Sequence, residues 1–103
     1  MKGIRKARRL SRDVDEVADF YELQSAALAM KFLTAFGDAV RRLRAFPSIG
    51  SPRYRHMLDM PGLRCVQTDT FPYLLFYREQ GGRLILARLL HNSRDITTLL
   101  KQG

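Results

Sequence analysis

The polar run that follows the last long apolar segment contains three residue types able to do proton or phosphate chemistry. His91, Arg94 and Asp95 stand in the run His-Asn-Ser-Arg-Asp, where the end of a strand would present them together. A histidine exchanges protons near neutral pH, and an arginine suits bidentate binding of phosphate. Cleavage of RNA without a metal needs a base, an acid and cations for the developing charge. The candidate residues for such catalysis are His91, Arg64, Arg78 and Arg94.

We favour a structural interpretation of the same residues over a catalytic one. His91 would close the last strand, and Arg94 with Asp95 would form a local ion pair or a helix cap. The two histidines, His56 and His91, are distant in the sequence and lack clustered carboxylates, so we expect no metal site. No Gly-rich phosphate loop follows a strand, and no nucleophile with an oriented base is indicated, so we expect no cofactor.

The composition predicts one globular domain that spans residues 1–103. Hydrophobic residues make up 46% of the chain, and no apolar run approaches the ~20 residues needed to span a membrane. The single cysteine, Cys65, fits a reducing cytosol, so we expect a cytoplasmic protein. The net charge of +8 favours acidic partners, namely nucleic acid, an acidic protein segment or an anionic membrane, and of these we expect no membrane.

The first quarter of the chain predicts a strand and a helix. Residues 4–10 alternate weakly and carry lysine and arginine, which suits a short edge strand. Asp13, with Glu16 three residues later, resembles a capping box, and Ser11 competes as the cap. Apolar residues then recur at helical spacing, which predicts a first amphipathic helix to about Gln24.

A second helix follows after a short connection. Ser25 is expected to cap it, and Pro47 ends it because proline lacks an N–H. Its apolar stripe consists of Leu28, Phe32, Phe36 (or Leu33), Val40 and Leu43. Two helices so connected should form an antiparallel hairpin whose apolar stripes pack on a sheet or a partner.

Residues 48–62 contain two prolines and two glycines and are expected to form an irregular loop. The loop carries a basic and aromatic cluster, which consists of Arg53, Tyr54, Arg55 and His56. Such a cluster can contact phosphates and stack on bases, although a solvated loop is the commoner meaning.

Three strands and a short helix are predicted in the last third of the chain. The expected strands cover residues 63–68, 73–79 and 83–91, and a short helix covers 96–101. A two-residue turn at Gly81-Gly82 would pair Arg78 with Ile85, Phe76 with Ala87 and Leu74 with Leu89. We expect this face to pack on the helices. The opposite face should be partly covered and partly wet, and it carries Tyr73, Leu75, Tyr77, Leu84, Leu86, Arg88 and Leu90.

The predicted fold class is therefore α+β. It has an N-terminal strand, an antiparallel helical hairpin packed on a small, mainly antiparallel β-sheet, and a short C-terminal helix.

A set of short motifs follows in order across nearly the whole chain. They are the basic first strand with Ser11, the helix VDEVADFYE, Ala29 with Phe32 and Leu33, the series Leu43, Phe46-Pro47, Gly50 and Pro52-Arg53, then Pro61-Gly62-Leu63-Arg64, FPYLLFYR and LLHNSRD. This ordered set resembles the ParE branch of the RelE/ParE superfamily, the toxins of bacterial type II toxin–antitoxin pairs. The fold that this resemblance implies agrees with the pattern above.

The resemblance implies a toxin that inhibits DNA gyrase and forms a hetero-oligomer with a neutralising ParD-type antitoxin. It would meet DNA only through the antitoxin or gyrase. RelE-like members instead cut mRNA in the ribosome, using lysines and arginines on the sheet. No lysine occurs here between Lys31 and Lys101, so we favour inhibition by binding, without catalysis. A RelE-like ribosome-dependent endoribonuclease is the alternative, and a degenerate toxin that only binds its antitoxin ranks third.

We expect two sets of residues to contact the protein partners. For the antitoxin they are Phe32, Phe36, Val40, Tyr73, Leu75, Tyr77 and Arg88. For the target they are Arg53, Arg55, His91 and Arg94.

Overall fold

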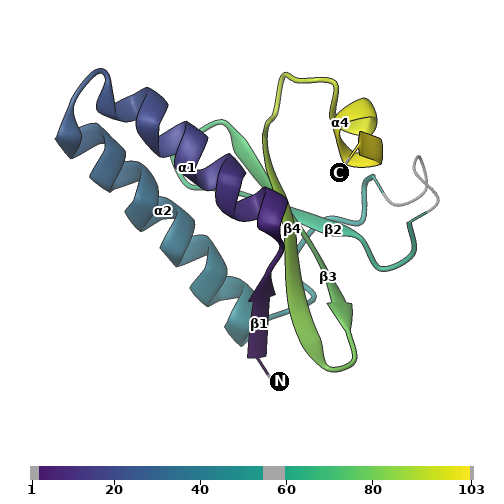
Figure 1. Cartoon of the computed structure of the whole chain (residues 1–103). Helices are drawn as coiled ribbons and strands as arrows, with labels where there is room; N and C mark the ends of the chain where they lie inside the picture. The colour runs from purple at the N-terminus through teal and green to yellow at the C-terminus, as the bar shows by residue number, and fades with distance from the viewer. Residues whose placement is uncertain (1–2, 55–59, 103) are drawn as a thin grey trace.

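The computed structural model describes residues 3–54 and 60–102, and shows a helical hairpin against a four-stranded sheet (Figure 1). The elements are β1 (Gly3–Lys6), α1 (Arg8–Glu22), α2 (Ala26–Ala45), β2 (Arg64–Gln67), β3 (Tyr73–Gln80), β4 (Arg83–His91) and α4 (Ile96–Gln102). The strand order is β1-β4-β3-β2, with β1 parallel to β4 and the other pairs antiparallel. The predicted α+β class is confirmed.

Each face of the sheet has its own apolar core. The helices α1 and α2 cover one face, and α4 lies on the other side (Figure 1). The helical-hairpin core includes Leu10, Phe32, Phe36, Leu43, Leu75, Tyr77, Leu84, Leu86 and Leu89. The core on the α4 side includes Tyr54, Leu63, Leu74, Phe76, Leu90, Ile96 and Leu100. Because both faces of the sheet are buried, the sequences of the long strands contain continuous apolar runs.

The first helix begins earlier than the sequence predicts. The strand β1 ends at Lys6 and α1 starts at Arg8, so Leu10 is a fully buried helical residue rather than part of a strand. The position before the helix is Ala7, which provides no side-chain cap. The predicted capping box is therefore wrong. Asp13 lies inside the helix, and its carboxylate points toward the sheet, where it pairs with the buried Arg88.

The second helix follows the prediction closely. The Ser25 hydroxyl accepts the Leu28 N–H at 3.0 Å, and the helix ends at Ala45, before the proline. Phe36 is buried whereas Leu33 is exposed, which decides between the two alternatives for the stripe.

A β-bulge changes the pairing predicted for the hairpin. Arg78 pairs with Ile85 as expected, but the register shifts between Phe76 and Tyr77, so Phe76 pairs with Arg88 and Leu74 with Leu90. The shift leaves Ala87 as the extra residue on β4. Sequence alternation has a fixed period of two and cannot anticipate an inserted residue.

The assignment of the two sheet faces is also reversed on β3 and at the start of β4, whereas Leu89 packs under the helices as predicted. Tyr73, Leu75 and Tyr77 point into the core under the helical hairpin, whereas Leu74 and Phe76 belong to the core on the α4 side. The expected wet face is therefore wrong, because both faces are apolar and alternation alone cannot tell which one the helices cover.

The buried hydroxyl of Tyr77 explains how a tyrosine fits the core. It accepts the Gly50 N–H at 2.9 Å and donates to the Pro47 carbonyl at 2.7 Å. Both partners lie in the loop after α2, so the loop satisfies the polar end of the side chain. A Cβ at Gly50 would overlap the Tyr77 ring, and this close approach requires glycine.

Candidate functional site

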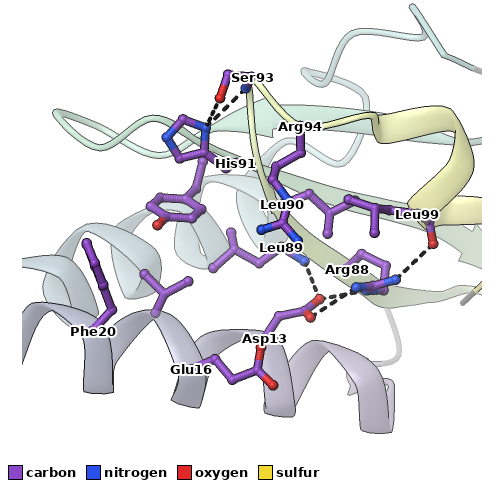
Figure 2. Close-up of a pocket in the computed structure, with 12 residues that line it drawn as sticks. Asp13, Glu16, Phe20, Arg88, Leu89, Leu90, His91, Ser93, Arg94 and Leu99 are labelled. Atoms are coloured by element: carbon purple, nitrogen blue, oxygen red, sulfur yellow. Dashed lines mark hydrogen bonds and ion pairs between the residues drawn. The ribbon is translucent and has the colours of Figure 1, made fainter.

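A groove of about 440 Å³ lies where α1, the end of β4 and α4 meet (Figure 2). Its lining residues come from four elements and the turn after β4. They are Asp13, Glu16, Val17, Phe20, Tyr73, Arg88, Leu89, Leu90, His91, Ser93, Arg94 and Leu99.

The groove exists because β4 is longer than its neighbour β1. The strand β1 pairs with β4 only from Arg83 to Leu86, and the Ala7 N–H closes the ladder on the Leu86 carbonyl at 2.9 Å. Beyond that point, β4 is an edge strand within the described sheet. The chain then turns into α1, which packs against β4, and its residues Asp13, Glu16, Val17 and Phe20 line the opposite side of the groove.

A buried ion pair forms the base of the groove. Asp13 Oδ2 accepts from Arg88 Nε at 2.7 Å, and Oδ1 accepts from Nη2 at 3.2 Å. The same Oδ2 accepts the Leu89 N–H at 3.0 Å, while Arg88 Nη1 donates to the Leu99 carbonyl at 3.0 Å (Figure 2). The Asp13 and Arg88 residues are only 8% and 6% exposed. The pair therefore joins α1, β4 and α4.

Asp13 also caps part of the β4 edge. Its bond to the Leu89 N–H shows that Leu89 directs its backbone groups away from β3. Because backbone direction alternates along a strand, the N–H and C=O of His91 point to the same edge. The His91 carbonyl accepts the Arg94 N–H at 3.1 Å in the following turn. The carboxylate and the turn thus protect an edge that could otherwise pair with another chain.

His91 is held in one orientation at the end of the groove. Its Nδ1 accepts the Ser93 N–H at 3.1 Å and lies 2.7 Å from Ser93 Oγ. Since Nδ1 is an acceptor here, the neutral ring carries its proton on Nε2. The ring packs edge-on against Tyr73, with centroids 5.2 Å apart. Burial, and then the neighbouring Tyr21, raise the pKa of the Tyr73 hydroxyl.

The rim combines an exposed aromatic ring with charges of both signs. Phe20 is 54% exposed on α1, although it packs edge-on against Tyr21. Glu16, one turn earlier, and Arg94, from the turn after β4, are also exposed. An open groove that combines apolar side chains with charged and polar groups suits a bound protein segment.

The predicted catalytic residues are not brought together. Arg64 Nη1 donates to the carbonyls of Gly50 and Ser48 at 2.8 and 3.3 Å, where it secures the loop after α2. Arg78 is level with Ile85 in the sheet, and His91 lies six residues further along β4, roughly 20 Å away. Only His91 and Arg94 share a groove.

The structural interpretation of the terminal polar run is supported by its contacts. Asp95 accepts from the Thr98 N–H at 3.3 Å, from Thr98 Oγ1 at 2.7 Å and from Thr97 Oγ1 at 3.0 Å. It therefore caps α4, and the hydrogen bonds from Thr98 lower the pKa of the carboxyl. Among the described residues, no His, Cys, Asp and Glu side chains gather in a group able to hold a metal ion.

Most residues predicted to contact the antitoxin belong to the interior. Buried members of that set are Phe32, Phe36, Tyr73, Leu75, Tyr77 and Arg88, and Val40 is half-buried. Only Tyr73 and Arg88 line the groove, as part of its floor. The sheet face that carries Tyr73, Leu75 and Tyr77 was expected to be partly wet, and the helices cover it instead.

Of the residues predicted to contact the target, His91 and Arg94 lie in the groove. Arg53 is exposed in the loop and stacks its guanidinium 4.7 Å from the Tyr54 ring centroid. Arg55, like His56, lies outside the described residues.

Asp13, Glu16 and Phe20 were missed as groove residues. One signal was available for Asp13, because it falls on the apolar stripe of α1 with Leu10 and Val17. An acidic residue at such a position indicates a buried partner.

The fold and the groove together define a small α+β domain suited to binding another protein. The family model described as "ParE toxin of type II toxin-antitoxin system, parDE" matches residues 4–96. The chain therefore belongs to the ParE toxin family. A solved structure titled "Chromosomal ParDE TA system from P. aeruginosa" is similar, with a TM-score of 0.73 and 21% sequence identity. The similarity covers 88% of this chain and 96% of that chain. The search of curated proteins gave no match.

Within the described residues, no helix is long and apolar enough to cross a membrane.

Proposed function

We propose that this ParE-family chain inhibits DNA gyrase by binding it, and that a ParD-type antitoxin neutralises it by occupying the groove between α1 and the end of β4. The observation that carries the antitoxin part is the open groove with the exposed Phe20 ring at its rim. The family assignment supports the toxin role. The protein would act in the bacterial cytoplasm, where gyrase works.

The groove has the properties that a folding antitoxin segment needs. Apolar side chains of the segment would cover Phe20 and Val17, which removes apolar surface from water. Arg94 offers a charged hydrogen-bond donor at the rim, and Glu16 offers an acceptor. The net charge of +8 favours an acidic segment and speeds its association.

Substitution at the groove tests the antitoxin site. Phe20→Ser should weaken binding of the cognate antitoxin by about 10- to 100-fold, because the exposed ring would be buried under the antitoxin segment. Phe46→Ser is the matched control, because Phe46 is 65% exposed at the far end of α2 and does not line the groove. Titration calorimetry on both variants would measure the difference. Equal affinities would place the antitoxin elsewhere.

Gyrase supercoiling assays test the target. The purified toxin should inhibit supercoiling and stabilise cleaved DNA, and the antitoxin should restore activity. A lack of inhibition at micromolar excess of folded toxin would rule out gyrase as the target.

The endoribonuclease alternative receives less support. Its four proposed residues are dispersed, with Arg64 engaged by loop carbonyls and Arg78 far along the sheet from His91. These four residues therefore do not form a cleft that combines a base, an acid and phosphate-binding cations.

A further inference from the structure

The outer face of the sheet, opposite the helical hairpin, carries a second and more strongly charged surface. Arg5 on β1 pairs with Ile85 on β4, and Arg78 on β3 pairs with the same residue. The three side chains therefore stand in one row on one face. Arg83, two residues before Ile85, shares that face because strand side chains alternate. Three arginines thus surround one aliphatic residue.

Two adjoining hollows lie along this surface. One has a volume of about 370 Å³ and the other about 410 Å³, and they share Arg5, Gln80 and Ile85. The larger hollow extends to the start of α1, where Arg8 and Arg9 line it. Together the two hollows form a cationic groove with the rim Arg5, Arg8, Arg9, Arg78 and Arg83.

The charge of the cationic groove is not neutralised within the described structure. The ion pairs found there involve Arg41, Arg42 and Arg88, and none of the five rim arginines. Arg88 also lines the larger hollow, but Asp13 already balances its charge.

The start of α1 adds to the positive charge of the cationic groove. Arg8 and Arg9 occupy the first turn of the helix, which contains no acidic residue, so their charges oppose the helix dipole. A bound anion would offset this unfavourable interaction.

We infer that the cationic groove binds the phosphate backbone of duplex DNA directly. Arginine matches phosphate with two parallel hydrogen bonds. Single-stranded nucleic acid is recognised mainly by bases stacked on aromatic rings. The described lining residues are arginines, aliphatic residues, one glutamine and one glycine, without an aromatic ring. Contacts restricted to phosphate fit a duplex and predict binding without sequence preference.

Fluorescence anisotropy with a labelled 20-base-pair duplex tests the inference on the purified chain without gyrase, so its outcome is separate from the proposed inhibition. The double variant Arg5→Gln/Arg78→Gln should bind about tenfold or more weakly near 100 mM salt, and its salt slope should fall by about two. The control Arg41→Gln/Arg44→Gln makes the same charge change on α2, which lies against the opposite face of the sheet, and should change affinity less than about twofold.

Thermal unfolding followed by circular dichroism must show that both double variants remain folded. Equal weakening by the two pairs would mean that DNA responds only to net charge, and the inference would fail. It would also fail if the folded chain bound no duplex at low salt. A polyglutamate peptide that bound through Arg5 and Arg78, and that duplex DNA could not displace, would identify a peptide site instead.

Discussion

Asp13, in the second turn of α1, and Arg88, near the end of β4, form a buried ion pair with a shortest distance of 2.7 Å. The pair connects helix to strand across most of the chain length, and its remaining hydrogen bonds reach the Leu89 N–H and the Leu99 carbonyl. Every strong polar group of this small cluster therefore has a partner. The ion pair therefore joins α1 to β4 at the base of the groove.

Removal of one partner of this pair should be severely destabilising. Asp13→Asn leaves the Arg88 charge buried and uncompensated, which typically costs about 3–5 kcal/mol of unfolding free energy. Urea denaturation should show this loss. Asp15→Asn, an exposed change on the same helix, is the control and should shift the free energy of unfolding by less than about 0.5 kcal/mol. If both variants unfolded alike, the ion pair would be unimportant for stability.

Alanine substitutions at Gly50 and at Gly37 should change the free energy of unfolding in opposite directions, because only Gly50 lies against the Tyr77 ring. Gly50→Ala places a methyl group against the Tyr77 ring and should cost about 1–3 kcal/mol. Gly37→Ala, inside α2, meets only ordinary van der Waals contact with Arg41 and should stabilise the protein by about 0.5–1 kcal/mol. Thermal denaturation of the two variants would measure both signs. A neutral Gly50→Ala would mean that the loop can move away from the ring.

The buried tyrosines predict a loss of stability at alkaline pH. Burial is the main cause that raises the pKa of Tyr77 and of Tyr73. A raised pKa in the folded state means that their contribution is complete below the unfolded-state pKa of about 10 and declines as the pH rises through the folded-state pKa. Urea midpoints measured from pH 8 upward should fall beyond pH ~10. Tyr77→Phe should show a smaller fall. An equal fall in both proteins would assign the effect to other groups.

Replacement of His91 should make no difference to transcripts. A catalytic base would contribute about 10²- to 10⁴-fold to RNA cleavage, but the arginines proposed to assist His91 are dispersed. We expect intact transcripts in a translating extract both with the wild type and with His91→Ala. Ser93→Ala removes only the hydroxyl beside the ring and is the control. Cleaved transcripts that disappear with His91→Ala would establish the nuclease alternative.

Local signals in the sequence predict most of the element order. Ser25 as a cap, the stop before Pro47 and the Gly81-Gly82 turn depend on a few neighbouring residues, and each is found as expected. The paired apolar segments also predict the strands. The start of α1 was misjudged because its true first turn contains basic residues and no capping side chain, so local chemistry gives no signal there.

The site was less predictable because it depends on long-range geometry. The bulge at Ala87 alters which β4 residues face the helices, and no local residue marks it. The groove arises from a difference in length between β1 and β4, which is a property of the pairing and not of either segment. His91 and Arg94 were found because they end a strand, whereas Phe20 looks like an ordinary surface residue until its neighbours are known.

The parallel pairing of β1 with β4 has a consequence for synthesis of the protein. The first strand has no sheet to join until the ribosome has made the last strand, and the groove needs Leu99 as well as Asp13. Contacts so distant in sequence form late. A nascent chain therefore lacks the surface proposed for the antitoxin until residues as far as Leu99 have been translated, so neutralisation at that surface must follow their synthesis.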